Sequence, residues 1–154
     1  MDALPAARSQ PLGPVPDPRV PMVGVLRVLL LTEAGGALAL AIFLSLLAGG
    51  QAELVGGDAG RSAEVGLRFA AGASIIFAIL AAVASRGARR RRPSAWTLAA
   101  MLQVAAAVAT GAAALVTEWH PLFLAGFAIA ALVMLVLSTA SVRRALGQEP
   151  TPNS

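Results

Sequence analysis

The stretch "LRVLLLTEAGGALALAIF", Leu26 to Phe43, decides the fold, because it is an apolar run of membrane-crossing length that nevertheless contains a carboxylate. A helix needs about 20 predominantly apolar residues to cross the hydrocarbon core of a bilayer. The carboxylate belongs to Glu33, and an acidic side chain is costly at this depth in lipid. The stretch therefore predicts a membrane helix on which Glu33 points toward other protein rather than toward lipid.

The composition of the whole chain also indicates a membrane protein. Of its 154 residues, 57% are hydrophobic and 13% are charged, whereas a soluble domain carries roughly a quarter charged residues. The chain has no Cys, which excludes disulfides, thiolate metal sites and a cysteine nucleophile. We therefore expect a polytopic membrane protein.

Four apolar segments predict four membrane helices, at about residues 25–49, 65–85, 94–117 and 122–142. They must be helices, because an open sheet cannot satisfy its backbone in lipid. Short connections make consecutive helices antiparallel, so the predicted fold is all-α, an up-down-up-down four-helix transmembrane bundle. Residues 23–146 form this domain, and residues 1–22, which are rich in proline, and residues 147–154 are predicted to be disordered cytoplasmic tails.

A cleaved signal peptide is an alternative interpretation of the first segment. The small residues "GQA", Gly50 to Ala52, resemble a cleavage site. The apolar region before them is far longer than the usual 7 to 15 residues and contains Glu33. We therefore favour a membrane helix that stays in the protein.

The arginines predict the orientation, because short cytoplasmic loops of membrane proteins are enriched in basic residues. All twelve basic residues are Arg. With four crossings, Arg61 and Arg68 lie outside, and both termini lie in the cytoplasm. The arginines expected to set topology or to contact anionic lipids at the cytoplasmic face are Arg86, Arg89, Arg90, Arg91, Arg92, Arg143 and Arg144. The chain offers no soluble basic face for nucleic acid.

Two segments carry a resemblance to a known group of proteins. They are "AAVASRGARRRRPSAWTLAAMLQVAAAVATG", residues 81–111, and "STASVRRAL", residues 138–146. The chain resembles the small four-helix integral membrane proteins of high-GC actinobacteria, in which an Arg-rich loop leads to an arginine, a tryptophan and a leucine-glutamine pair. Here these are Arg92, Trp96, Leu102 and Gln103. The resemblance implies the architecture and a bacterial cytoplasmic membrane, and it implies no activity, since that group is uncharacterised.

Helical periodicity predicts a partner for Glu33. Glu33 shares a helix face with Gly36, Ala37 and Ala41, and small faces in membranes are helix contact faces. Gln103 lies on a similar face of the third segment. Both side chains lie about 9 to 10 Å from the cytoplasmic interface at 1.5 Å per residue. We therefore expect Glu33 and Gln103 to form an intramembrane polar pair, with Ser138 or Thr139 approaching the same layer, and we expect Glu33 to be a neutral donor because a low dielectric disfavours charge.

Two functions remain open for this pair. In the first, Glu33 and Gln103 hold smooth, alanine-rich helices in register, and the protein is a non-enzymatic interaction or accessory component of the membrane. In the second, Glu33 binds protons or a cation, and the protein is a small proton-coupled or cation transporter, acting as a dimer. The second function lacks a relay of further acids within the helices. The layout is similar to that of small multidrug transporters, but the aromatic residues of a cation pocket are missing.

Other chemistry finds little support in the sequence. His120 is the single histidine and has no set of further metal ligands around it. A nucleophile, base and orienting group cannot be assembled. We therefore expect no enzyme activity, no cofactor and no metal. The expected partners are the lipid bilayer with its anionic lipids and a second copy of the chain or another membrane protein. Pairs of small residues that permit close packing are Gly35 with Ala39, Ala107 with Gly111, and Gly126 with Ala130.

Overall fold

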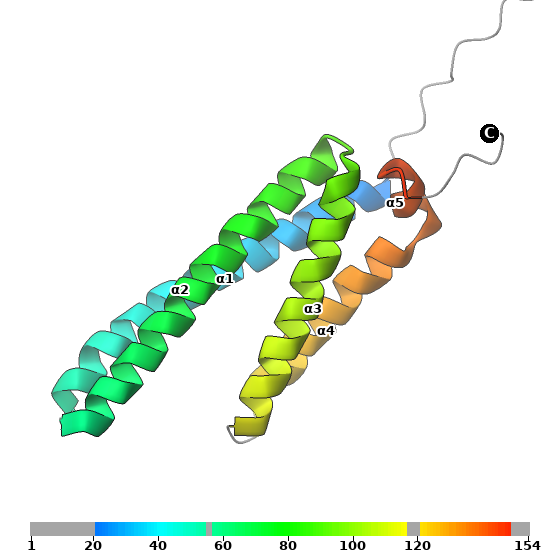
Figure 1. Ribbon diagram of the computed structural model, residues 1–154. Coiled ribbons are helices and arrows are strands. Elements are labelled where there is room, and N and C mark those ends of the chain that lie inside the picture. Colours follow the sequence, from blue (N-terminus) through cyan, green and yellow to red (C-terminus); the bar gives the residue numbers. More distant parts are fainter. Residues whose placement is uncertain (1–20, 55–56, 117–120, 149–154) are drawn as a thin grey trace, which may run out of the picture.

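The protein is helical throughout the part of the chain that the structure describes. The computed structural model describes residues 21–54, 57–116 and 121–148. Its helices are α1 (Pro21–Leu54), α2 (Gly57–Arg89), α3 (Pro93–Val116), α4 (Pro121–Ser138) and α5 (Ala140–Ala145) (Figure 1). The predicted all-α class is confirmed for these residues. Most of the two predicted tails, residues 1–22 and 147–154, lies outside them, at residues 1–20 and 149–154.

The first two helices are longer than the sequence analysis predicts. α1 begins at Pro21, inside the predicted tail, and it continues to Leu54. α2 begins at Gly57, so most of the connection expected at residues 50–64 is helical. Ala, Glu, Leu and Arg in this connection are good helix formers even though they are not a continuous apolar run. Asp58 in the first turn of α2 also complements the positive end of the helix dipole. The apolar pattern thus found the membrane-compatible core of each helix and missed its polar ends.

Within the described residues, three helices are long and apolar enough to cross a membrane: Pro21–Gly50, Gly57–Arg89 and Pro93–Leu115. In α4 the corresponding apolar stretch, Leu124–Ser138, is shorter. Large apolar side chains are exposed along the helices, and Phe69 and Leu115 are 79% and 85% exposed. A soluble monomer rarely exposes so much contiguous apolar surface. These features fit a multi-pass membrane protein.

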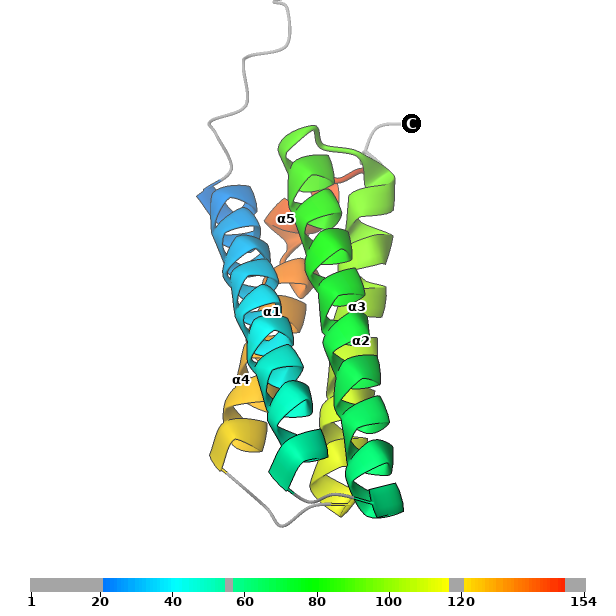
Figure 2. The same ribbon diagram turned by 90° about the vertical axis from the view of Figure 1, so that its left-hand side faces the viewer.

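The helices form two hairpins. Figure 2 shows α1 and α2 side by side along their length, and Figure 1 shows α3 and α4 as a second pair behind and beside them. We call the end of the molecule that holds the α2–α3 turn, residues 90–92, the arginine end, and the other end the far end. The two hairpins meet at the arginine end and diverge toward the far end (Figure 1).

The packed core lies in the half of the molecule near the arginine end. Its fully buried members come from every helix and are joined in one cluster, which includes Leu26, Leu30, Ala84, Ala99, Leu102, Val133, Leu137, Val142 and Leu146. Nearer the far end the buried side chains are mostly alanines, such as Ala41, Ala48 and Ala71. Leucine and valine therefore join the hairpins at one end, whereas small residues let helices pack closely elsewhere.

The fourth predicted segment, residues 122–142, is interrupted. α4 ends at Ser138, and Thr139 is extended, with φ −64° and ψ 135°. The Thr139 carbonyl then accepts hydrogen bonds from the amides of Val142 and Arg143, at 3.1 and 3.0 Å, and so begins α5. The predicted end at residue 142 is wrong, because Val142 belongs to a separate short helix whose apolar residues cover the core at the arginine end.

Candidate functional site

The polar pair expected from the sequence is joined by a hydrogen bond. Gln103 on α3 donates from Nε2 to Oε2 of Glu33 on α1, at 2.7 Å. Gln103 is almost completely buried, and Glu33 is half-buried. The contact links residues 70 positions apart in the chain, and it therefore ties the first hairpin to the second.

The pair lies at the border of the packed core. One helical turn before Glu33 is Leu30, and one turn before Gln103 is Ala99, and both are core members. One turn further on, Gly36 is exposed, and a Cβ built on it would meet nothing within 4 Å. The hydrogen bond therefore joins the hairpins where their apolar packing ends and their divergence begins.

One atom of the pair has no partner. The Oε1 atom of Gln103 is buried and accepts no hydrogen bond from any described residue. A buried carbonyl oxygen without a donor is unfavourable by about 1 to 3 kcal/mol. In the structure Glu33 is the acceptor, whereas the sequence analysis expected it to donate. Gln103 Oε1 is the acceptor beside it that a protonated Glu33 could use.

The hydroxyl groups expected near this layer bond elsewhere. Ser138 donates to the carbonyl of Met134 at 2.7 Å, and Thr139 donates to that of Val136 at 2.7 Å. Thr32, next to Glu33, likewise donates to Val28 on its own helix at 3.0 Å. Such bonds satisfy a hydroxyl within one helix. The polar layer thus consists of Glu33 and Gln103, without the expected contribution of α4.

Trp96 has a role that the sequence analysis missed. Its Nε1 donates to the Leu137 carbonyl at 3.1 Å. In a continuous helix that carbonyl would accept the amide four residues onward, and the interruption at Thr139 removes that partner. Trp96 supplies the donor and ties α3 to the end of α4. Only the helix break, which has no proline or glycine to signal it, could have indicated this contact.

The predicted arginines lie together at the arginine end. Arg86 and Arg89 are in the last turns of α2, and Arg90, Arg91 and Arg92 form the turn into α3. Arg143 and Arg144 are exposed on α5, at the same end. Most of the basic side chains in the described part of the chain are therefore gathered at one end of the helices.

Backbone hydrogen bonds make the α2–α3 turn compact. Arg92 N donates to Gly87 O at 3.1 Å, and Arg91 N donates to Ala88 O at 3.1 Å. This is the Schellman pattern that closes many helices, in which the residue at Arg91 adopts a left-handed conformation and is usually glycine. Arg91 indeed has φ 51°. The turn directs neighbouring arginines to different sides of the helix end.

The remaining sequence predictions have separate outcomes. Glu64 and Arg68 form an ion pair on α2, with 2.6 Å between Glu64 Oε1 and Arg68 Nη2. Trp119 and His120 lie outside the described residues. Within the described ranges no cluster of His, Cys, Asp or Glu could hold a metal ion. The small pair on α4 packs as expected of small residues, since a Cβ on Gly126 would meet Thr110 of α3 at 3.5 Å.

Comparison with known proteins adds no assignment. Neither a protein-family model, nor a curated protein, nor a solved structure matches the chain.

Proposed function

We propose that the protein is a non-enzymatic interaction or accessory component of a bacterial cytoplasmic membrane. It crosses the membrane four times, with both termini and the arginine end in the cytoplasm. The resemblance to small actinobacterial membrane proteins and the arginines gathered at one end support this placement, because basic residues favour the cytoplasmic side.

The observation that carries the proposal is the hydrogen bond between Gln103 and Glu33. It engages the acid of the first helix in a contact between hairpins. Ser45 and Ser74 instead bond within their own helices, to the carbonyls of Ala41 and Ala70. In this proposal the polar groups of the helices support packing within the chain. We assign the interaction with other proteins to the exposed apolar faces near the far end.

The test compares the parent protein with Glu33→Gln, both reconstituted in lipid. An uncharged amide keeps a hydrogen bond to Gln103 and cannot release a proton. We expect Glu33→Gln to change the thermal unfolding midpoint while neither protein releases protons when organic cations are added. Proton release that cations provoke in the parent and that Glu33→Gln abolishes would contradict the proposal.

A second experiment addresses the interaction itself. A photoreactive residue replaces Leu46, which is 72% exposed near the far end of α1. We expect a discrete protein cross-link in native membranes, because this face has no packed neighbour among the described residues. A photoreactive residue at the exposed Ile79 of α2, nearer the arginine end, is the matched control. If both positions give only lipid adducts, the interaction role is wrong.

A second candidate function is supported by the unpartnered Oε1 of Gln103. A proton on Glu33, or a small cation between the two side chains, would supply the donor or charge that this oxygen lacks. The protein would then be a small proton-coupled or cation transporter, and a second copy would complete its path. Reconstituted protein would move protons or cations across vesicles, and Glu33→Gln would abolish this movement.

A further inference from the structure

A cavity lies at the α2–α3 turn, separate from the Glu33–Gln103 pair. Its volume is about 390 Å³. Three arginines line it, Arg86, Arg90 and Arg92, together with Ser94 in the first turn of α3. Its other walls are apolar and include Val83 of α2 and Leu98 of α3. The cavity is therefore basic toward the arginine end and apolar toward the membrane-compatible part of the helices.

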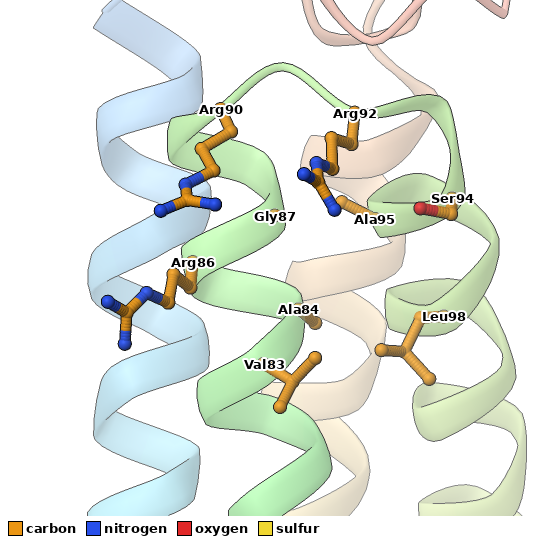
Figure 3. Close-up of a pocket in the computed structure, with 9 residues that line it drawn as sticks. All are labelled: Val83, Ala84, Arg86, Gly87, Arg90, Arg92, Ser94, Ala95 and Leu98. Atoms are coloured by element: carbon orange, nitrogen blue, oxygen red, sulfur yellow. The ribbon is translucent and has the colours of Figure 1, made fainter.

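Figure 3 shows how these side chains are arranged. The guanidinium of Arg92 points into the space between α2 and α3, above Ala84 and Leu98. Arg86 and Arg90 project from the flank of α2, one helical turn apart, with their guanidinium groups on the α1 side, away from Arg92, and Val83 lies below them. A ligand in the cavity would therefore meet positive charge at one end and aliphatic side chains at the other.

The charges around the cavity are not neutralised within the described chain. Arg86, Arg90 and Arg92 make no ion pair or side-chain hydrogen bond with any described residue. The ion pair that does form on α2, between Glu64 and Arg68, lies toward the far end. The first turn of α3 adds the positive end of a helix dipole beside Ser94. An anion would be stabilised by all of these groups together.

We propose that this cavity binds the phosphate group of an anionic phospholipid. Arg92 contacts the phosphate oxygens, since guanidinium groups match phosphate geometry with paired donors. Arg86 and Arg90 also line the cavity, and their long side chains turn from the flank of α2 toward the phosphate when the lipid binds. An acyl chain lies along Val83 and Leu98. Free phosphate would use the charges and leave the apolar wall unused, so we commit to the lipid. The proposal rests on the membrane placement above and is independent of the role of Glu33.

Other arginines of the α2–α3 turn provide a control that distinguishes a binding site from a general attraction to anionic lipid. Arg89 and Arg91 belong to the same run of arginines but do not line the cavity. One double variant changes both Arg90 and Arg92, and the other changes both Arg89 and Arg91. Each removes the same charge from the same turn. A diffuse attraction to an anionic surface depends on the charge removed, whereas a binding site depends on which arginines are removed.

The experiment titrates purified full-length protein in detergent with short-chain phosphatidylglycerol, short-chain phosphatidylcholine or inorganic phosphate. Binding raises the unfolding midpoint, and its dependence on ligand concentration gives Kd. We expect phosphatidylglycerol to bind at least about tenfold more tightly than either of the other two ligands. Arg90→Gln with Arg92→Gln should weaken its binding by about tenfold or more, and Arg89→Gln with Arg91→Gln by about twofold at most.

Replacing arginines could also change the topology or the folding of the protein. A variant that keeps every charge tests the site without these effects. Val83→Trp places a large side chain at the apolar wall, where Val83 is 53% exposed. We expect it to reduce phosphatidylglycerol binding while the helical circular dichroism signal stays that of the parent. Retained binding in Val83→Trp would overturn the position assigned to the acyl chain.

Three other results would overturn the proposal. Equal losses in the two double variants would show diffuse attraction, and equal affinity for inorganic phosphate would show that the lipid is not the ligand. No preference for phosphatidylglycerol in folded parent protein would exclude the site and leave the proposed interaction role untouched. Failure of the parent to reconstitute in lipid, the step that the Glu33→Gln test requires, would instead contradict the membrane placement itself.

Discussion

Glu33 and Gln103 form one hydrogen bond between helices of the two hairpins. Interhelical hydrogen bonds in membranes contribute about 0.6 kcal/mol on average, because the separated helices find other partners. The sequence predicted this contact, since the small residues around each side chain define a face and the two depths agree. It could not predict that Gln103 Oε1 is left without a donor, because that depends on side-chain rotamers.

The pair can be tested by a double-mutant cycle with Glu33→Leu and Gln103→Leu. Because the two side chains share a hydrogen bond, we expect a coupling free energy of about 0.6 to 1.7 kcal/mol. Reversible unfolding in mixed micelles provides the measurement. The matched control combines Thr32→Val with Gln103→Leu, and its effects should add, since Thr32 bonds within its own helix. Additive effects for the first pair would show that the contact contributes nothing.

Among the described residues other than glycine, Arg91 is the one with a positive φ. Its φ of 51° is typical of glycine at this position of a Schellman turn, and a left-handed conformation costs other residues about 1 kcal/mol or more. Arg91→Gly should therefore raise the free energy of unfolding by about 1 kcal/mol. Arg89→Gly removes the same charge from the last turn of α2 and should lower it by about 1 kcal/mol. Thermal unfolding of the three proteins distinguishes the two directions, and equal shifts would mean that charge alone matters.

At the scale of the helices, Gly87 permits α2 and α3 to approach closely. A Cβ on Gly87 would lie 2.9 Å from the Cβ of Ala95. Gly87→Ala should therefore destabilise the protein by about 1 to 3 kcal/mol through overpacking. Gly72→Ala is the control on the same helix, because a Cβ there meets nothing within 4 Å. The unfolding midpoint should fall for the first variant only, and Gly87→Ala with Ala95→Gly should recover it. A fall that this second change does not reverse would mean that the close approach is not its cause.

The helices also show which parts of the fold the sequence could predict. Long apolar runs predicted the existence and type of each main helix. Their ends were missed because residues such as Pro21 and Asp58 continue a helix without being apolar. The interruption at Thr139 was missed for a different reason: no proline or glycine marks it, and the Leu137 carbonyl that it frees accepts a hydrogen bond from Trp96 of another helix. A tertiary contact of this kind leaves no local signal in the sequence.

At the scale of the whole molecule, the core and the polar pair lie in one half, and the hairpins diverge in the other (Figure 1). Lipid chains are as apolar as leucine, so only packing and polar contacts hold helices together in a membrane. Between the Glu33–Gln103 pair and the far end, neither packing nor polar contacts join the two hairpins strongly. The far end should therefore be the part of the molecule in which the hairpins move relative to each other.

Spin labels can test this because the chain has no native cysteine. One pair of labels, at the exposed Val65 of α2 and Leu124 of α4, reports on the far end, and a second pair, at Arg89 and Arg143, reports on the arginine end. We expect a broad distance distribution for the first pair and a narrow one for the second, measured by pulsed electron resonance in lipid. Gln103→Leu should broaden the first distribution further, because the hydrogen bond at the border of the core is lost. Equally narrow distributions at both ends would mean that the hairpins are joined along their whole length, by contacts with lipid or with a second copy that the isolated chain does not make.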